Sequence, residues 1–350
     1  MNPIFYTAAT SGEEAVPSFH PHQNVIGPHV SHKTTDGRRS SCRTFPGEFD
    51  LGTWFGGKGM DAGAPLTVII DGNHLGWPVN LASHAGPKIM MVGHLPKSPV
   101  FRRELAAYVA EEPFDLIVLT HGPGGSDLFA VAGQAPVVIR PGWLSPSRAA
   151  SRSWFRTSTR RAGVACDSTT ASAGSVLHQV LAEMRAQDLE PQTWGGGLGG
   201  RRALFAKTAV SLMIPEDGDL PAEAWEALVA GSAVVVLDRA GHDWASELPM
   251  VVTHGCGVAV DEIRQILEDP KRGASLRNRA ENWYEANLSL KVRRRDWTRM
   301  LERLHDVSIL HEVLPRKSLG PEWNWPVSES GHPFLRVSPA DGQIVLLALP

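Results

Sequence analysis

The sequence predicts an α/β protein built from two doubly wound domains. Short apolar segments alternate with amphipathic ones from residue 66 to 140, and a second alternating series begins after residue 163. This alternation is typical of parallel strands that helices cover on both faces. The length of 350 residues also exceeds what one compact core usually fills. Because such folds bind ligands beyond the carboxyl ends of their strands, we expect the two domains to face a cleft.

The first domain is expected to span residues 1–145. Residues 1–64 are rich in Gly, His, Ser and Pro, and predict only a short strand at "IFYTA". The apolar runs after them predict strands, and the two segments with helical periodicity predict helices. The expected strands are 66–71, 88–93, 114–121 and 135–140, and the expected helices are 99–112 and 126–133.

A linker at 146–162, rich in Pro, Ser and Arg, leads to a second domain at 163–305. Its expected helices are 171–187, 201–207, 221–231 and two or three more from 260 to 305, and its expected strands are 189–197, 209–215 and 233–238. A C-terminal tail, 306–350, contains "FLRVSPADGQIVLLAL", which predicts a hairpin that turns at Asp341-Gly342.

Composition excludes several classes of protein. Hydrophobic content of 42% and charged content of 20% describe a soluble globular chain, and no apolar run is long enough to span a membrane. Three scattered cysteines (Cys42, Cys166 and Cys256) predict a reducing cytoplasm rather than a disulfide framework. The cluster "FHPHQNVIGPHVSH" makes a zinc site conceivable, but no cysteine lies near it, so no metal is expected. Nothing in the sequence sets the oligomeric state.

An acidic loop stands between an apolar strand and a helix. Glu216, Asp217, Gly218 and Asp219 form this loop, and Glu226 lies within the following helix. Carboxylates at a helix start complement the helix dipole by about 0.3–1 kcal/mol each, which explains Asp219 alone but not the whole group. Carboxylates beyond a strand can also accept hydrogen bonds from the vicinal hydroxyls of a ribose or another sugar. This loop is therefore the first candidate binding site.

At these residues the chain resembles the donor-binding half of GT-B glycosyltransferases, in their bacterial and phage group-1-like branch. "EDGDLP" and "WEALVAGS" correspond to that branch's "NGDLN" and "FEVLAAGG". Upstream, "DGNHLGWPVNLASHAGPKIMMVGH" and "EEPFDLIVLTH" are similar to its first domain, so the resemblance covers roughly residues 66–305. It implies two Rossmann-like domains and a hexosyl- or pentosyltransferase that uses a nucleotide sugar, UDP-sugar first, with no further cofactor.

The resemblance also implies roles for single residues. Glu226 would hold the ribose hydroxyls, and Gly231 would let its helix approach the sheet closely. Asp219 or Glu216 would reach the donor sugar, although Gly218 occupies the position at which many relatives have a second Glu.

A glycine-rich stretch, "TWGGGLGG", follows the strand at 189–197. By resemblance it lies near the nucleotide base, where Trp194 would stack and Gly195 would give room; a plain flexible turn is the alternative. "DSTTASAGS" precedes a helix whose N-terminal amides could accept a diphosphate. No basic residue stands in that loop, so Arg201, Arg202 or Lys207 would supply the charge.

Candidate catalytic groups follow the strands of the first domain. His74, His94 and His121 each come after an expected strand, and Asp71 ends one. An inverting transfer needs a base that removes the proton of the acceptor hydroxyl, and His or Asp suits that task. We predict His94, His121 and Asp71 as the catalytic set, with a structural role for each as the alternative. A retaining mechanism would need no such base.

The linker carries arginines at a helical spacing. Arg148, Arg152, Arg156 and Arg160 recur every four residues, with Trp154 among them and no acidic residue from 128 to 166. Arginines with interleaved aromatics suit a phosphate backbone and flipped bases, so Arg148, Arg152, Arg156 and Trp154 are candidates for binding a DNA acceptor that carries a hydroxymethylated base. A solvated connecting helix is the plainer interpretation.

Alternatives at the level of function stay open. The acceptor could be a saccharide, a lipid or a protein. The chain could also be an epimerase-like enzyme of similar architecture, or a binding module for nucleotide sugars without turnover.

Overall fold

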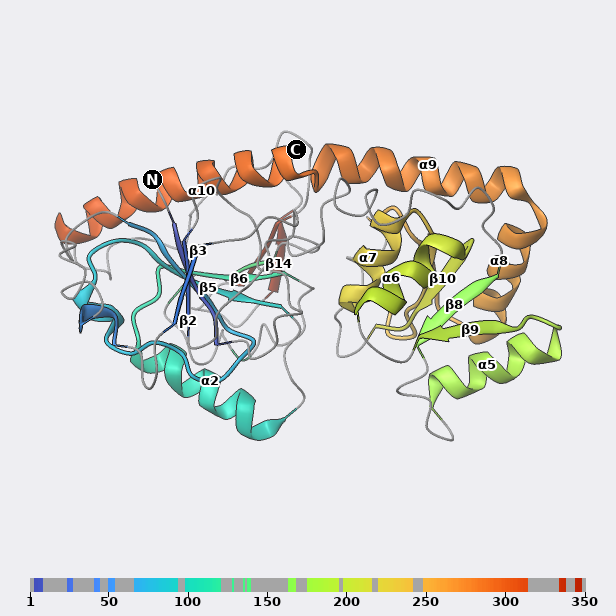
Figure 1. Cartoon of the computed structure of the whole chain (residues 1–350), viewed down its shortest axis with the longest axis horizontal. Coiled ribbons are helices and arrows are strands. Elements are labelled where there is room, and N and C mark those ends of the chain that lie inside the picture. Colours follow the sequence, from blue (N-terminus) through green and yellow to red (C-terminus); the bar gives the residue numbers. More distant parts are fainter. Residues whose placement is uncertain are drawn as a thin grey trace. The chain divides into compact units, whose positions relative to one another are not determined.

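The structure is a computed structural model, and it divides into two units (Figure 1). Unit 1 comprises Met1–Leu144 together with Leu290–Pro350, and unit 2 comprises Ser145–Ser289. The described residues are 3–8, 24–27, 41–44, 50–53, 66–93, 98–120, 128, 135, 137–139, 163–167, 175–194, 198–215, 220–241, 248–313, 334–337 and 344–347.

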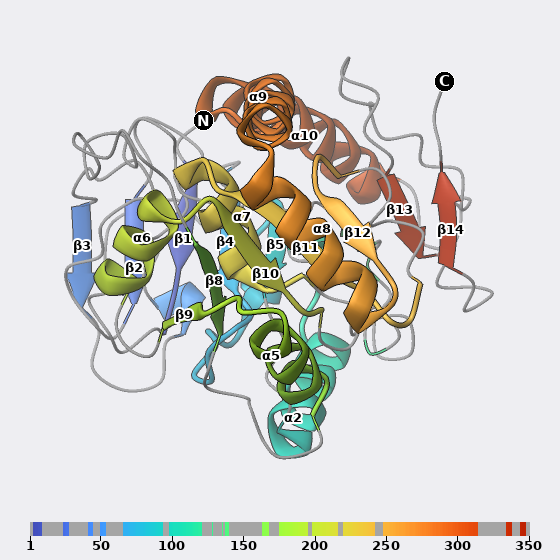
Figure 2. The ribbon, with the colours of Figure 1, turned by 90° about the vertical axis from the view of Figure 1, so that its right-hand side faces the viewer.

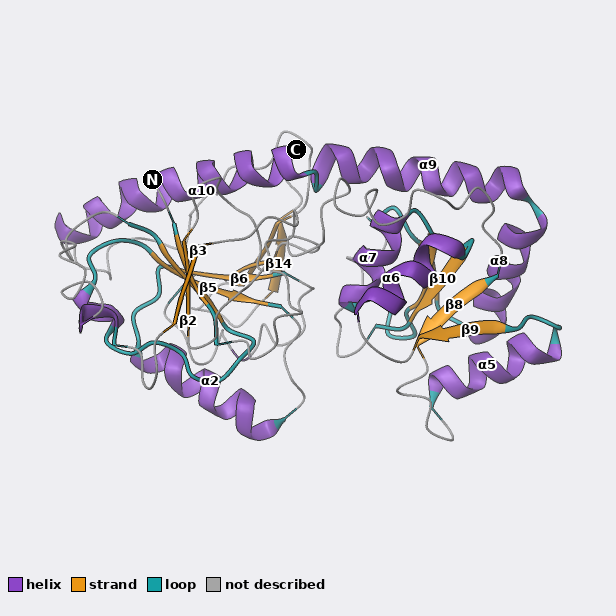
Figure 3. Ribbon diagram, viewed as in Figure 1, coloured by secondary structure: helices purple, strands orange, loops and turns teal. Residues whose placement is uncertain are grey.

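Unit 1 contains a nine-stranded sheet (Figure 3). From one edge to the other the strands are β14 (Ile344–Leu347), β13 (Phe334–Val337), β7 (Val137–Ile139), β6 (Leu116–Leu119), β5 (Lys88–Val92), β4 (Val68–Asp71), β1 (Ile4–Tyr6), β2 (Asn24–Gly27) and β3 (Ser41–Thr44). The pairs from β7 to β3 are parallel, whereas β13 and β14 form an antiparallel hairpin that joins the edge at β7.

The strand order of unit 1 reverses between β1 and β4. From β1 the chain moves outward to β2 and β3, and it then returns to β4 on the other side of β1. The central order 3-2-1-4-5-6 is that of a Rossmann-like sheet, whose ligands bind where the order reverses. β1 and β4 are paired from Ile4 with Val68 to Tyr6 with Ile70, so their carboxyl ends lie side by side at this point.

Helices α2 and α10 lie on the two faces of this sheet (Figures 1 and 2). α2 (Pro99–Glu111) begins after Ser98, whose hydroxyl accepts a hydrogen bond from the Phe101 amide. It buries Phe101, Leu105 and Val109. α10 (Leu290–Val313) buries Trp297, Leu301 and Leu304. These apolar side chains recur at helical spacing, which explains why each helix buries one side.

Unit 2 contains a five-stranded parallel sheet. In order, its strands are β12 (Val251–Thr253), β11 (Ala233–Leu237), β10 (Val210–Met213), β8 (Val164–Asp167) and β9 (Pro191–Trp194). This is the other common doubly wound order, 2-1-3-4-5, and it reverses between β8 and β10. The loops after these two strands are therefore the expected ligand loops.

Five helices of unit 2 flank this sheet among the described residues. They are α5 (Val176–Ala186), α6 (Leu198–Lys207), α7 (Ala222–Ala230), α8 (Cys256–Glu268) and α9 (Pro270–Asn287). α5 and α8 share one apolar core with every second strand residue, for example Val235 and Leu237. Val234 and Val236 are buried too and point to the opposite face, because strand side chains alternate.

The predicted α/β class with two doubly wound sheets is confirmed, and the details differ in three ways. β2, β3, β8 and β12 were not expected, since each is short and lacks a long apolar run. α6 begins at Leu198, so three residues expected in a glycine-rich turn (198–200) are helical. The expected boundary at residue 305 differs from the observed division, because α10 and the hairpin belong to unit 1.

The helix expected at 126–133 lies almost wholly outside the described residues. Within the described part, no helix is both long and apolar enough to cross a membrane.

Candidate functional site

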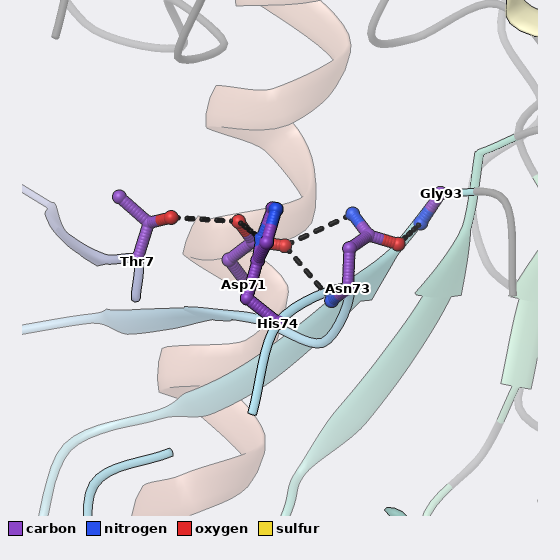
Figure 4. A network of polar contacts seen from close by, with 5 residues as sticks. All are labelled: Thr7, Asp71, Asn73, His74 and Gly93. Carbon is purple, nitrogen blue, oxygen red and sulfur yellow. Dashed lines mark hydrogen bonds and ion pairs between the residues drawn. The ribbon is translucent and has the colours of Figure 1, made fainter. Parts of the chain in front are cut away.

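Asp71 ends β4 at the point where the strand order of unit 1 reverses, and its carboxylate accepts hydrogen bonds from four donors (Figure 4). Oδ1 accepts from the Asn73 amide nitrogen at 3.0 Å and from Asn73 Nδ2 at 2.9 Å. Oδ2 accepts from Thr7 Oγ1 at 2.7 Å and lies 3.0 Å from His74 Nδ1. Since a carboxylate offers about four lone-pair sites, this one is fully engaged by the protein.

The loop after Asp71 is held at further points. Asn73 Oδ1 accepts from the Gly93 amide at 2.7 Å, which ties this loop to the end of β5. The Tyr6 hydroxyl donates to the Gly76 carbonyl oxygen at 2.5 Å, which ties the loop to β1. His74 therefore stands on a short loop that two neighbouring strands fix, and its side chain is 27% exposed.

Burial raises the pKa of Tyr6 to about 12. The phenol therefore stays protonated at neutral pH and can act as the donor to Gly76. Burial, followed by the negative charge of Glu112, also raises the pKa of Tyr108, whose hydroxyl donates to the Pro78 carbonyl oxygen at 2.6 Å. Both ends of the segment 76–78 thus accept a hydrogen bond from a neutral phenol, one buried (Tyr6) and one half-buried (Tyr108).

This geometry changes the chemistry expected of Asp71. A carboxylate whose four acceptor sites are engaged by the protein has little capacity left for a substrate hydroxyl or a metal, and the contact that it offers to a titratable group is the one with His74. The Nδ1 contact orients the imidazole, and the other ring nitrogen, Nε2, is the group that can exchange a proton. His74 and Asp71 form a pair of the kind that performs general base catalysis.

In unit 2, Glu226 and Arg201 are brought together. Arg201 Nε donates to Glu226 Oε2 at 2.8 Å, and Arg201 Nη1 donates to Glu223 Oε1 at 2.5 Å. Glu226 is 8% exposed, whereas Arg201 and Glu223 are 18% and 22% exposed. One guanidinium from α6 therefore joins two carboxylates one turn apart on α7.

α7 follows β10, which borders the reversal of strand order in unit 2. Pro221 precedes its first residue, and Gly231 ends it with φ 81°, a left-handed conformation that glycine adopts without strain. Gly231 was expected to permit close helix packing, and its positive φ gives a second reason for glycine. With two carboxylates and one guanidinium, this cluster carries a formal charge of −1, which suits hydroxyl donors rather than phosphate.

The other predicted site residues are not seen in contact with either cluster, and most of them lie outside the described residues. His94, His121, Gly195, Glu216, Gly218, Asp219, Arg148, Arg152, Arg156 and Trp154 lie outside the described residues. Trp194 is the last residue of β9, and Lys207 is exposed at the end of α6. Among the residues that the structure describes, no three His, Cys, Asp or Glu side chains are grouped closely enough to hold a metal ion.

Thr7, Asn73 and Tyr6 were not identified from the sequence. Thr7 lies within the strand that the sequence predicted at "IFYTA", directly after the last residue of the observed strand β1. The missing information was that β1 pairs with β4, 64 residues further along the chain, which places Thr7 beside Asp71.

The sequence matches no protein-family model, and it matches no curated protein. Its fold is similar to the folds of several solved structures. A UDP-forming α,α-trehalose-phosphate synthase from Burkholderia vietnamiensis aligns with 87% of this chain and 100% of its own, with a TM-score of 0.52 and 11% identity. The α,α-trehalose 6-phosphate synthase from Burkholderia multivorans aligns with 75% of this chain and 74% of its own, with a TM-score of 0.49 and 11% identity.

At such identities the likeness is one of fold. The narrower resemblance to the group-1-like branch stays a prediction. The chain has the GT-B fold of glycosyltransferases, with two Rossmann-like units.

Proposed function

We propose that this protein is a glycosyltransferase that moves a hexosyl or pentosyl group from a nucleotide sugar to a hydroxyl acceptor. The observation that carries the proposal is the GT-B fold, with a doubly wound sheet in each unit and a buried carboxylate, Glu226, on the helix that follows strand β10. That strand borders the reversal of strand order, which is where such sheets bind nucleotides.

Glu226 holds the ribose hydroxyls in this proposal. Arg201 positions the carboxylate, because its Nε–H occupies one oxygen and fixes the side-chain rotamer. Glu216 or Asp219 reaches the donor sugar, and Trp194 stacks on the base. Arg202 and Lys207 are the remaining cations for the diphosphate, since Arg201 is already shared by two carboxylates.

UDP-sugar is the first donor to test, because the similar synthase is described as UDP-forming. Cys166 and Cys256, which form no disulfide within the described residues, fit a reducing compartment such as the cytoplasm.

The acceptor is a hydroxyl compound. A saccharide, a lipid or a protein is the default, and nothing described in the structure supports DNA. The arginine spacing that suggested DNA can still be tested by binding to duplex DNA at about 50 and 200 mM salt, since six or more phosphate contacts would cost at least about 10³-fold over this range. A variant with Arg148, Arg152 and Arg156 changed to Ala is the comparison.

The donor is tested by a thermal-shift panel of UDP-, GDP- and dTDP-sugars, followed by an assay for released nucleotide. A bound donor raises the apparent melting temperature of the native protein. We expect one nucleotide series to raise it in the native protein and to raise it less in Glu226→Gln. If no sugar nucleotide shifts the melting temperature, the proposal is wrong. A shift without nucleotide release, even with a broad acceptor panel, would instead indicate a binding module.

A further inference from the structure

We propose that Arg201 and Glu223 are positioning residues for Glu226, and that this cluster selects nucleotides by the hydroxyls of their ribose and not by their phosphates. The inference rests on the proposed function, because it concerns the carboxylate that holds the ribose in that proposal. It assigns a role to Glu223, and it replaces the phosphate-binding role that the sequence suggested for Arg201.

The guanidinium of Arg201 is held at two of its nitrogens. Nε donates to Glu226 Oε2 at 2.8 Å, and Nη1 donates to Glu223 Oε1 at 2.5 Å. The two glutamates are three residues apart on α7, so their side chains leave the same side of the helix. Because a guanidinium is planar and rigid, two contacts at different nitrogens fix both its position and its plane. Glu223 therefore determines the direction of the N–H group that meets Glu226.

An oriented carboxylate binds a ribose at lower cost than a mobile one. The terminal torsion of a glutamate is soft, so a carboxylate that nothing orients must be ordered when the ligand binds. Ordering one such side chain lowers affinity by about three- to tenfold. Arg201 orders Glu226 in advance. Since a carboxylate offers about four acceptor sites, a contact with a guanidinium is compatible with accepting hydroxyls as well.

The charge of the cluster makes phosphate an unfavourable ligand. One guanidinium and two carboxylates carry a formal charge of −1, so a diphosphate that approached Arg201 would meet net negative charge. All three side chains are buried or half-buried, and salt screens such groups only weakly. Ribose hydroxyls are neutral and can donate to carboxylates, so they meet no such repulsion. A nucleotide without these hydroxyls should therefore gain little from the cluster.

The role of Arg201 is tested by calorimetric titration of the full-length protein with UDP, uridine and 2′,3′-dideoxy-UDP. The variant is Arg201→Lys, because lysine keeps the positive charge and lacks the fork that reaches both glutamates. We expect this change to lower the affinity for UDP by about three- to tenfold and the affinity for uridine by the same factor. The affinity for 2′,3′-dideoxy-UDP, which has no hydroxyl for Glu226, should stay unchanged.

Three patterns in Arg201→Lys overturn the inference. A loss for UDP without a loss for uridine means that Arg201 binds the diphosphate. Equal losses for UDP and 2′,3′-dideoxy-UDP mean that its role is structural only, and three unchanged affinities mean that it has no role in binding. Arg272→Lys is the matched control, because Arg272 also pairs with a carboxylate of unit 2, that of Glu262 on α8. We expect it to change none of the three affinities.

Glu223→Gln is a second test, and it keeps Arg201 together with its contact to Glu226. Glutamine has the size of glutamate without its charge, so the guanidinium is held less firmly at Nη1. We expect the affinities for UDP and uridine to fall together, by less than about fivefold. If Glu223 instead kept Arg201 away from the diphosphate, the same change would tighten the binding of UDP alone, and that result overturns the inference even where Arg201→Lys does not fold.

The inference and the proposed function fail in different ways. If no nucleotide of the thermal-shift panel binds to the native protein, the proposed function is wrong. If UDP binds and the variants show one of the contrary patterns, only the inference is wrong. Should the panel favour GDP-sugars, then guanosine, GDP and 2′,3′-dideoxy-GDP replace the uridine compounds. A preference for dTDP-sugars, whose nucleoside has no 2′-hydroxyl, overturns the inference and leaves the proposed function standing.

Discussion

The two candidate clusters described above each hold a buried carboxylate near the reversal of strand order in a sheet, and they stabilise it by different means. Asp71 is stabilised by four donors, of which three come from the next three residues of the chain. Glu226 is stabilised by an arginine 25 residues away on another helix. The first cluster is built mainly from local chain geometry and the second from packing between helices.

This difference bears on what each carboxylate can do. Asp71 has its acceptor sites engaged, so it orients a neighbour. Glu226 shares one guanidinium with Glu223, so the three side chains together carry a formal negative charge, which in the proposed function accepts hydrogen bonds from a ligand's hydroxyls. A carboxylate that acts through a histidine gains from saturation, whereas one that grips a ribose must keep capacity to accept.

The largest effect is expected on breaking the second cluster. Arg201→Ala removes the cation next to Glu226, whose side chain is 8% exposed. Deleting one partner of a buried ion pair leaves a charge whose desolvation is no longer compensated, so we expect a loss of about 2–4 kcal/mol in the free energy of unfolding. Urea unfolding followed by circular dichroism measures it.

Lys207→Ala is the control, because Lys207 is an exposed cation at the end of the same helix, α6. It should cost less than about 0.5 kcal/mol. Adding Glu226→Gln to Arg201→Ala should recover part of the loss, since the uncompensated charge is then gone. Equal costs for Arg201→Ala and Lys207→Ala would mean that the cluster contributes nothing to stability.

A smaller effect, on binding, separates the two glutamates of α7. Glu226→Ala should weaken nucleotide binding by about 1–3 kcal/mol, the usual cost of losing a hydrogen bond to a charged group. Glu223→Ala removes the more exposed carboxylate from the same guanidinium and should weaken binding by less than about 1 kcal/mol. Isothermal titration calorimetry with the nucleotide found above measures both.

A loss of affinity in Glu226→Ala alone would show that the two glutamates of α7 differ in their role in binding. Unchanged affinity in Glu226→Ala would end its assignment to the ribose. Equal losses in both variants would mean that Arg201, rather than either glutamate, sets the site.

The contrast between the clusters also explains what the sequence could predict. The fold class followed from periodicity, because buried parallel strands such as "AVVVL" and "LIVL" are continuous apolar runs. Strands such as "SCRT" and "PQTW" carry no such signal, and "SCRT" was therefore missed. The return of the hairpin to unit 1 could not be foreseen either, because which strand lies at a sheet edge is set by tertiary packing.

For the site, local sequence was sufficient to indicate candidate residues, but it could not show which distant residues contact them. Asp71 was predicted as functional because it ends an apolar strand, and Glu226 because its helix, after an acidic loop, resembles a donor-binding helix. The partners that define their roles, Thr7 and Arg201, are 64 and 25 residues away in sequence. Arg201 was predicted as a phosphate ligand on charge alone, and the pairing with two carboxylates was visible only once α6 lay against α7.

The smallest effect expected concerns the phenol that fastens the loop of the first cluster, and it appears only at alkaline pH. Burial raises the pKa of Tyr6 to about 12, above the ordinary tyrosine value of about 10. The folded state therefore holds this proton when the unfolded state has lost it. The corresponding stability is fully present below about pH 10 and is lost as the pH rises from about 10 to 12.

Tyr6→Phe tests this sign. It removes the hydrogen bond to the Gly76 carbonyl oxygen, which should cost about 0.5–1.5 kcal/mol at neutral pH. It also removes the titrating group, so the variant should lose less stability than the native protein between pH 9 and about 11. Urea unfolding at several pH values measures how the free energy of unfolding changes with pH in the native protein and in the variant, which gives one slope for each. Identical slopes would show that Tyr6 ionises as readily in the folded protein as in the unfolded chain, and that the loop carrying His74 is not held by a buried phenol.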